Sequence, residues 1–98
     1  MTLALFNRHA REELLEIVAH IESERSGYGL RFAVVVEEAI EMLMRYPEAG
    51  ETTTGGNRRK HLVGFPYFLV YKPPSQGIYV VAIAHDKRHP AYWTSRIR

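Results

Sequence analysis

The sequence predicts an α+β fold in which a helical hairpin covers one face of a mainly antiparallel sheet. In the first half of the chain, apolar residues recur every three or four positions, which is the period of a helix with one buried face. In the second half, apolar and polar residues alternate in short runs, which is typical of strands. The expected order is an N-terminal strand, a helical hairpin, a three-stranded antiparallel meander and a short C-terminal tail.

The start of the chain is expected to form a strand followed by a helix. Residues 2–6 are a short apolar run that suits a strand. Asn7 follows, and its side chain offers an acceptor to the free N–H groups at the beginning of a helix. Apolar residues then share one face of a helix expected over residues 8–24, while most of the Glu residues lie elsewhere around it.

A second helix is expected after a short break. Residues 26–29 read Ser-Gly-Tyr-Gly, and the two glycines interrupt the helical pattern. Ser26 is placed to cap the helix that follows. The apolar stripe that begins at Phe32 ends at Tyr46, because Pro47 disfavours helical geometry in the residue before it. The two helices should form an antiparallel hairpin.

The second half of the chain is expected to form the meander. Residues 47–57 are rich in Thr and Gly and have no apolar periodicity, which indicates an exposed connection. Three strands are expected over residues 60–65, 67–72 and 78–85. In the last strand, alternation places Ile78, Val80, Ala82 and Ala84 on one face, and Tyr79, Val81, Ile83 and His85 on the other. Both sets are largely apolar, so this strand should be central and covered on both faces.

Length and composition limit the class of protein. Residues 1–98 are expected to form one domain, because this length suits a single core. The chain has no cysteine, which excludes disulfides and thiolate metal sites. No apolar run reaches the roughly 18 residues of a membrane span, and the N-terminus has no secretory pattern. We therefore expect a cytoplasmic protein with no membrane partner and no cofactor.

Charge is divided unevenly between the two halves. Residues 1–51 hold ten Glu and five Arg, a net charge of −5, whereas residues 52–98 hold eight Lys or Arg and one Asp, a net charge of +7. The basic half would attract a polyanion, either nucleic acid or an acidic protein segment. A solvated basic surface is the alternative interpretation.

Two basic segments form the candidate functional site. Residues 58–61 read Arg-Arg-Lys-His, and alternation would place Arg59 and His61 on one face of the sheet. Residues 85–89 read His-Asp-Lys-Arg-His at the end of the last strand, shortly before Tyr92 and Trp93. If the two segments meet, their guanidinium, imidazole and phenol groups could hold a phosphate, stack a base and cleave RNA without a metal.

Each of these residues also has a structural interpretation. The basic run suits a solvated strand edge, and His85 suits a hydrogen-bonded histidine at the end of an apolar strand. Tyr92 and Trp93 suit anchors that hold the tail against the sheet. His85 and His89 are four residues apart, but Pro90 interrupts any helix through them and no further ligand is evident, so no metal site is expected.

Three stretches carry a family resemblance. They are residues 43–50 (LMRYPEAG), 58–71 (RRKHLVGFPYFLVY) and 81–93 (VAIAHDKRHPAYW). In this order and spacing they resemble the RelE/ParE superfamily, the toxins of bacterial type II toxin–antitoxin systems, which include plasmid stabilisation proteins. The resemblance covers nearly the whole chain. It implies a compact growth-inhibiting toxin and a cognate antitoxin protein, encoded beside it, whose extended or helical segment wraps the toxin in a hetero-oligomer.

Members of this superfamily divide by target. RelE-like toxins cut mRNA in the ribosomal A site, whereas ParE-like toxins poison DNA gyrase. By position, the RelE-like basic cluster falls on Arg59 and His61, and the strand-end arginine falls on Arg88. Tyr92 lies near the position of the RelE-like C-terminal tyrosine. A further RelE-like arginine is replaced here by Phe68, so the resemblance favours DNA gyrase, or another target outside the RelE type, over mRNA.

These considerations leave three hypotheses. The first is a toxin directed at DNA gyrase, or at another target outside the RelE type, that acts through the exposed face of the sheet and the tail. The second is a ribosome-dependent, metal-independent mRNA endonuclease, in which Arg88 would stabilise phosphate charge and His61 or Tyr92 would transfer protons. The third is a basic binding module without toxicity. The candidate catalytic residues are Arg59, His61, Arg88 and Tyr92. The candidates for contacts with nucleic acid or another target are Arg58, Lys60, Lys87, His89 and Trp93.

Overall fold

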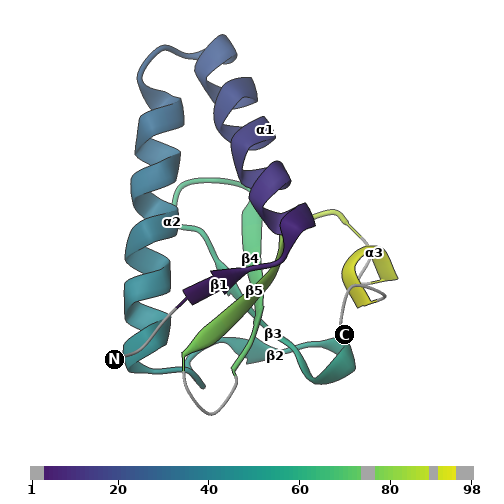
Figure 1. The fold of residues 1–98 in the computed structure, drawn as a ribbon. Helices are drawn as coiled ribbons and strands as arrows, with labels where there is room; N and C mark the ends of the chain where they lie inside the picture. Colours follow the sequence, from purple (N-terminus) through teal and green to yellow (C-terminus); the bar gives the residue numbers. More distant parts are fainter. Residues whose placement is uncertain (1–3, 74–76, 89–90, 95–98) are drawn as a thin grey trace.

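The computed structural model describes residues 4–73, 77–88 and 91–94. The elements follow one another as β1 (Ala4–Phe6), α1 (Arg8–Glu24), α2 (Tyr28–Arg45), β2 (Glu51–Thr52), the short 3-10 turn η1 (Thr54–Gly56), β3 (Arg58–His61), β4 (Tyr67–Lys72), β5 (Ile78–His85) and α3 (Ala91–Thr94). The strands form one sheet in the order β1-β5-β4-β3-β2, with β1 parallel to β5 and the other neighbours antiparallel. Helices α1 and α2 form a hairpin against one face of this sheet (Figure 1). The predicted α+β class is confirmed.

The helix caps are partly as predicted. The side chain of Asn7 accepts a hydrogen bond of 2.8 Å from the backbone N of His9, as expected of a cap. The predicted cap by Ser26 is wrong, because Gly27 occupies the cap position of α2. The carboxylate of Glu22 on α1 instead accepts hydrogen bonds from the backbone N of Gly27 and Gly29, at 2.9 and 3.0 Å. These bonds hold the pKa of Glu22 below its ordinary value.

The sheet has one strand more than predicted, and its first meander strand is shorter. The predicted connection 47–57 contains β2, in which Glu51 and Thr52 pair with Arg59 and Arg58. Strand β3 ends at His61, whereas the sequence pattern predicted a strand to Phe65. The chain turns there instead: the backbone N of Phe65 donates to the carbonyl of Leu62, and Gly64 has a φ of 88°. A positive φ favours glycine and ends the extended run.

A β-bulge in β5 changes which side chains face the helices. Val70 pairs with Ala82, but the next residue of β4, Tyr71, pairs with Val80. Val81 is therefore the extra residue of the bulge. The predicted alternation holds before the bulge and is wrong after it, because the side chains beyond Val81 exchange faces. Strand β5 is nevertheless central and covered on both faces, as predicted.

The apolar interior consists of a main core and a smaller cluster. The buried members of the main core are Ala10, Phe32, Val36, Leu43, Leu62, Leu69, Tyr71, Ile78, Val80 and Ile83. On the opposite face of the sheet, which we call the open face, the buried cluster is Val70, Val81, Ala82, Ala84 and Trp93. Helix α3 thus brings Trp93 onto the open face. Among the described residues, the helices are too short or too polar to cross a membrane.

Candidate functional site

The structure places Arg59 and His61 of β3 together on the open face. The Arg59 guanidinium lies 4.4 Å from the ring centroid of Phe68, and the His61 ring meets the same ring edge-on at 5.4 Å. Arg59 Nε also donates a 2.7 Å hydrogen bond to the carboxylate of Glu51 on β2. The predicted shared face of Arg59 and His61 is therefore observed, but the charge of Arg59 is already balanced.

Arg58, on the other face of β3, holds the chain that leads into the sheet. Its Nη1 donates to the carbonyls of Gly50 and Glu48, at 2.7 and 3.2 Å. The Tyr71 hydroxyl donates to the carbonyl of Pro47 at 2.7 Å and accepts from the backbone N of Gly50 at 3.0 Å. Burial raises the pKa of Tyr71, so the phenol keeps its proton and can donate it. Arg58 is thus part of the hydrogen-bond network that holds residues 47–50 against the sheet.

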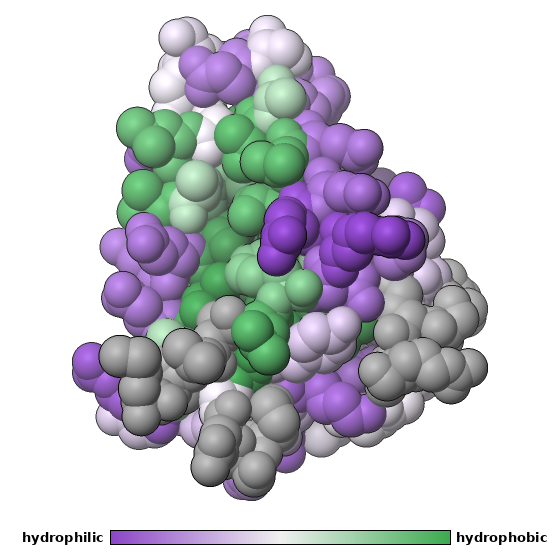
Figure 2. Space-filling model, viewed as in Figure 1, coloured by the Kyte–Doolittle hydropathy of each residue, from purple (hydrophilic) through white to green (hydrophobic). Residues whose placement is uncertain are grey.

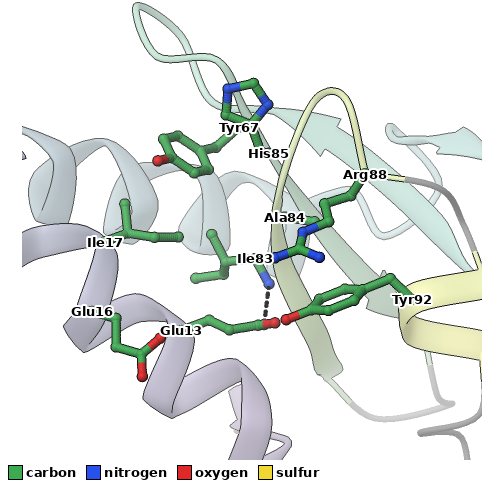
Figure 3. Close-up of a pocket in the computed structure, with 9 residues that line it drawn as sticks. All are labelled: Glu13, Glu16, Ile17, Tyr67, Ile83, Ala84, His85, Arg88 and Tyr92. Carbon is green, nitrogen blue, oxygen red and sulfur yellow. Dashed lines mark hydrogen bonds between the residues drawn. The ribbon is translucent and has the colours of Figure 1, made fainter. Parts of the chain in front are cut away.

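A polar pocket lies at the opposite end of the sheet, between α1, the end of β5 and α3 (Figure 3). Its volume is about 200 Å³. The lining residues are Glu13, Glu16, Ile17, Tyr67, Ile83, Ala84, His85, Arg88 and Tyr92. Carboxylate, imidazole, guanidinium and phenol groups from α1, β4, β5, α3 and the connection between β5 and α3 therefore surround one space.

The pocket exists because β1 is shorter than β5. Strand β1 ends at Phe6, opposite Val80, so the rest of β5 has no neighbouring strand on that side. Glu13 of α1 takes the place of a strand there, and its Oε1 accepts a 3.0 Å hydrogen bond from the backbone N of Ile83. The phenol end of Tyr92 points toward the same carboxylate (Figure 3). Sequence reasoning missed Glu13, because a Glu-rich helix face usually indicates solvent exposure.

Arg88 and Tyr92 form the wall of the pocket contributed by the tail. The Arg88 guanidinium lies 4.1 Å from the centroid of the Tyr92 ring, a cation–π contact. The backbone N of Arg88 donates to the carbonyl of His85 at 2.9 Å, which turns the chain at the end of β5. Arg88 forms no salt bridge with a carboxylate of the described residues. Its guanidinium lines the pocket together with Glu13 and Glu16.

His85 and Tyr67 form a further wall of the pocket. Their rings meet edge-on, with centroids 5.3 Å apart. Nδ1 of His85 lies 3.2 Å from the backbone N of Lys87 and 3.1 Å from Oδ1 of Asp86. One nitrogen serves one of them at a time: Nδ1 without a hydrogen accepts from Lys87, and Nδ1 with a hydrogen donates to Asp86. Burial raises the pKa of Tyr67, so this phenol is a hydrogen-bond donor and not a base near neutral pH.

The predicted catalytic residues therefore fall into two pairs. Arg59 and His61 lie together on the open face, whereas Arg88 and Tyr92 line a pocket whose other wall is α1, on the helix side of the sheet. The two basic segments do not form one constellation. The side chain of Phe68, which both β3 residues contact, is apolar. The four predicted catalytic residues therefore do not meet at one point, and the pocket that holds Arg88 and Tyr92 contains His85 in place of Arg59 and His61.

The remaining residues predicted to contact nucleic acid or another target lie in different parts of the molecule. Lys87 is exposed next to the pocket, and Lys60 is half-buried on β3. Trp93 is only 2% exposed in the open-face cluster, so it anchors α3, and its indole Nε1 has no hydrogen-bond partner among the described residues. His89 lies outside the described residues. Within the described ranges, no group of three or more His, Asp and Glu residues is arranged to hold a metal.

Comparisons with known proteins identify the family. The family model described as "ParE toxin of type II toxin-antitoxin system, parDE" matches residues 4–90. A solved structure titled "Chromosomal ParDE TA system from P. aeruginosa" superposes with a TM-score of 0.73 over 87% of this chain and 96% of that chain, at 19% identity, and so shares the fold. No curated protein matches the chain. The family match covers most of the sequence, and the chain therefore belongs to the ParE toxin family and is the toxin component of a type II toxin–antitoxin system.

Proposed function

We propose that this toxin stops bacterial growth by binding DNA gyrase in the cytoplasm through the polar pocket and its rim, not by cutting mRNA. Arg88 and Tyr92 would make the central contacts, and Lys87 would contribute from the rim. The proposal rests on family membership for the class of target and on the pocket for the residues. No cofactor is required for it.

The observation that carries the proposal is the separation of the two candidate pairs. Cleavage of RNA without a metal needs a base, an acid and a cation around one phosphate. Arg59 and His61 lie on the open face beside apolar Phe68, and Arg59 is held by Glu51. A binding surface has no such requirement. An arginine stacked on a tyrosine beside carboxylates is suited to recognise charged and polar groups of a protein.

The antitoxin is the second partner. Membership in a toxin–antitoxin family implies an antitoxin, and we propose that the two proteins form a hetero-oligomer in which the toxin cannot act. The basic second half, with a net charge of +7 over residues 52–98, supports attraction of an acidic antitoxin segment or of a protein that is bound to DNA. Antitoxin removal would then release the toxin.

Induction of the chain alone in bacteria tests the proposal. We expect growth arrest with double-strand DNA breaks and intact transcripts, relieved when the neighbouring antitoxin gene is co-expressed. Arg88→Ala should weaken the arrest at equal protein level. Transcripts cut at ribosomes without DNA breaks would support the mRNA endonuclease instead. Harmless accumulation of folded protein free of antitoxin would support the basic binding module.

A further inference from the structure

Helix α3 is too short to hold its own position. It has four residues, and isolated helices of fewer than about 12 residues are marginal in water. Its placement therefore depends on contacts with the rest of the molecule. The neighbouring residues Tyr92 and Trp93 supply such contacts on opposite sides of the sheet: Trp93 lies in the open-face cluster, whereas Tyr92 lines the polar pocket.

The contacts of these two residues are of different kinds. Trp93 is 2% exposed and is fixed by packing. Tyr92 is 36% exposed, so packing covers it less completely and does not by itself set the direction of its ring. Its phenol end points across the pocket toward the carboxylate of Glu13 on α1 (Figure 3). A polar group on another element therefore helps to set the direction of Tyr92.

Glu13 is attached to the sheet, unlike a carboxylate that extends into water. Figure 2 shows that the surface along α1 is largely hydrophilic. Glu13 is half-buried, and its Oε1 accepts the 3.0 Å hydrogen bond from the backbone N of Ile83. Ile83 is itself 2% exposed in β5. This bond fixes the carboxylate in place, and its other lone pairs can accept further hydrogen bonds at the pocket.

The direction of the Tyr92 ring in turn places Arg88. The Arg88 guanidinium lies 4.1 Å from the centroid of the Tyr92 ring, and a cation–π contact requires the cation to lie over the face of the ring. A change in the direction of the ring would therefore move the guanidinium from its place in the pocket wall. The backbone of β5, Glu13, Tyr92 and Arg88 thus follow one another in space.

We propose that Glu13 is a positioning residue of the target site: it sets the direction of Tyr92, and the Tyr92 ring holds Arg88 where the target binds. This inference rests on the proposed function and adds a role for α1 in it. Side chains that are ordered before binding lose less conformational entropy when a complex forms. Loss of Glu13 should therefore weaken target binding even though Arg88 and Tyr92 are both present.

Proton NMR of the purified chain tests the orientation of Arg88 without any target. Ring currents displace the signals of protons that lie over an aromatic face, so the Tyr92 ring should displace those of the Arg88 side chain. In Glu13→Ala this displacement should shrink. Arg59 is the internal control, because it lies 4.4 Å from the centroid of the Phe68 ring on the open face, and its signals should not move. An undiminished displacement for Arg88 in folded Glu13→Ala would overturn the proposal.

Inhibition of purified DNA gyrase tests the consequence for binding. Glu13→Ala should require about threefold to tenfold more protein than the wild type for the same inhibition. Glu13→Gln should lose less, because its amide oxygen can still accept from Ile83 and its amide keeps a polar group at the pocket. Glu12→Ala is the matched control, since Glu12 is an exposed carboxylate of α1 that does not line the pocket. Equal inhibition by Glu13→Ala and Glu12→Ala would contradict the proposal.

Further variants separate positioning from a general loss of stability. Tyr71→Phe removes hydrogen bonds of a residue that does not line the pocket, so it should inhibit gyrase like the wild type at a temperature where both are folded. Tyr92→Phe keeps the ring and removes the hydroxyl, and should weaken inhibition about as much as Glu13→Ala. The double variant of Glu13 and Tyr92 should be no weaker than either single variant, because both changes break the same arrangement. Additive losses would show that Glu13 does not act through Tyr92.

Growth arrest keeps this test distinct from that of the proposed function. A wild-type chain that arrests growth but leaves gyrase unaffected would contradict the proposed target. At matched protein levels, weaker arrest by Glu13→Ala than by Glu12→Ala would then still support the role of Glu13, and equal arrest would refute it. A wild-type chain that arrests nothing would contradict the proposed function, and the NMR comparison would still decide whether Glu13 orients Arg88.

Discussion

Arg59 and Arg88 both stack on aromatic rings, at 4.4 and 4.1 Å from the ring centroids, but their surroundings differ. Arg59 packs on Phe68 of the neighbouring strand and is fixed by the carboxylate of Glu51. Arg88 packs on Tyr92 of the tail, beside a pocket, without a carboxylate within salt-bridge distance in the described residues. A similar contact thus lies within the sheet in one region and on the wall of a pocket in the other.

The largest expected effect is on toxicity. Arg88→Ala should weaken target binding by about tenfold or more, because an arginine at the centre of a contact surface often carries much of the binding energy. Arg59→Ala should leave growth arrest close to that of the wild type. Growth curves at matched protein levels make the comparison. Loss of toxicity in Arg59→Ala with retention in Arg88→Ala would reverse the assignment of the two regions.

A large effect on stability is expected from Tyr71, in the hydrogen-bond network that holds residues 47–50 against the sheet. Tyr71→Phe removes the hydroxyl that bonds to the carbonyl of Pro47 and the backbone N of Gly50. Leaving such buried groups without a partner costs about 2 kcal/mol. Urea unfolding should show this loss, while growth arrest by the folded fraction persists. An unchanged unfolding midpoint would mean that Arg58 alone holds residues 47–50.

A smaller stability effect is expected in the pocket. Glu13→Ala leaves the backbone N–H of Ile83 without its carboxylate acceptor, at a cost of about 1 kcal/mol in unfolding free energy. Glu16→Ala is the control, because Glu16 lines the same pocket from the same helix and is exposed; its effect should stay within about 0.5 kcal/mol. Equal unfolding curves for the two variants would show that Glu13 does not support β5.

The smallest effect is expected from the ion pair of Arg59. Pairs between exposed side chains contribute about 0–1 kcal/mol, because water screens the charges. Glu51→Gln should therefore change the unfolding free energy by less than about 1 kcal/mol, and added salt should reduce the difference further. A loss well above this range would show that the pairing of β2 with β3 depends on the ion pair between Arg59 and Glu51. The ion pair of Arg59 would then be a main support of its region, in contrast to Arg88.

Local sequence patterns predicted much of the fold. Helical periodicity placed α1 at residues 8–24, and Pro47 correctly ended α2 close to Tyr46. Short-range patterns could not predict the bulge at Val81, because a bulge depends on how two strands pair and not on either strand alone. Strand β2 was missed for a similar reason: its two residues have no period of their own and are ordered by pairing with Arg58 and Arg59.

The candidate site was predicted in its residue types and not in its arrangement. Arg88 and Tyr92 do lie together, as their closeness in sequence suggested. Arg59 and His61 do not join them, because they lie on the open face of the sheet, whereas the pocket lies on the helix side. Which faces the two basic segments occupy depends on the assembled sheet and not on either segment alone. Glu13 could not be recognised from its own helix, since its role depends on the free edge of β5 that remains where β1 ends.

Two assays in parallel test the central claim most directly. The first measures supercoiling of relaxed plasmid by purified DNA gyrase in the presence of this toxin, and the second measures cleavage of mRNA on purified ribosomes. The account predicts that the wild-type chain inhibits supercoiling, that Arg88→Ala requires about tenfold more protein for the same inhibition, and that Arg59→Ala acts like the wild type, with mRNA intact throughout. Unaffected gyrase together with mRNA cleavage by the same preparation would contradict the account.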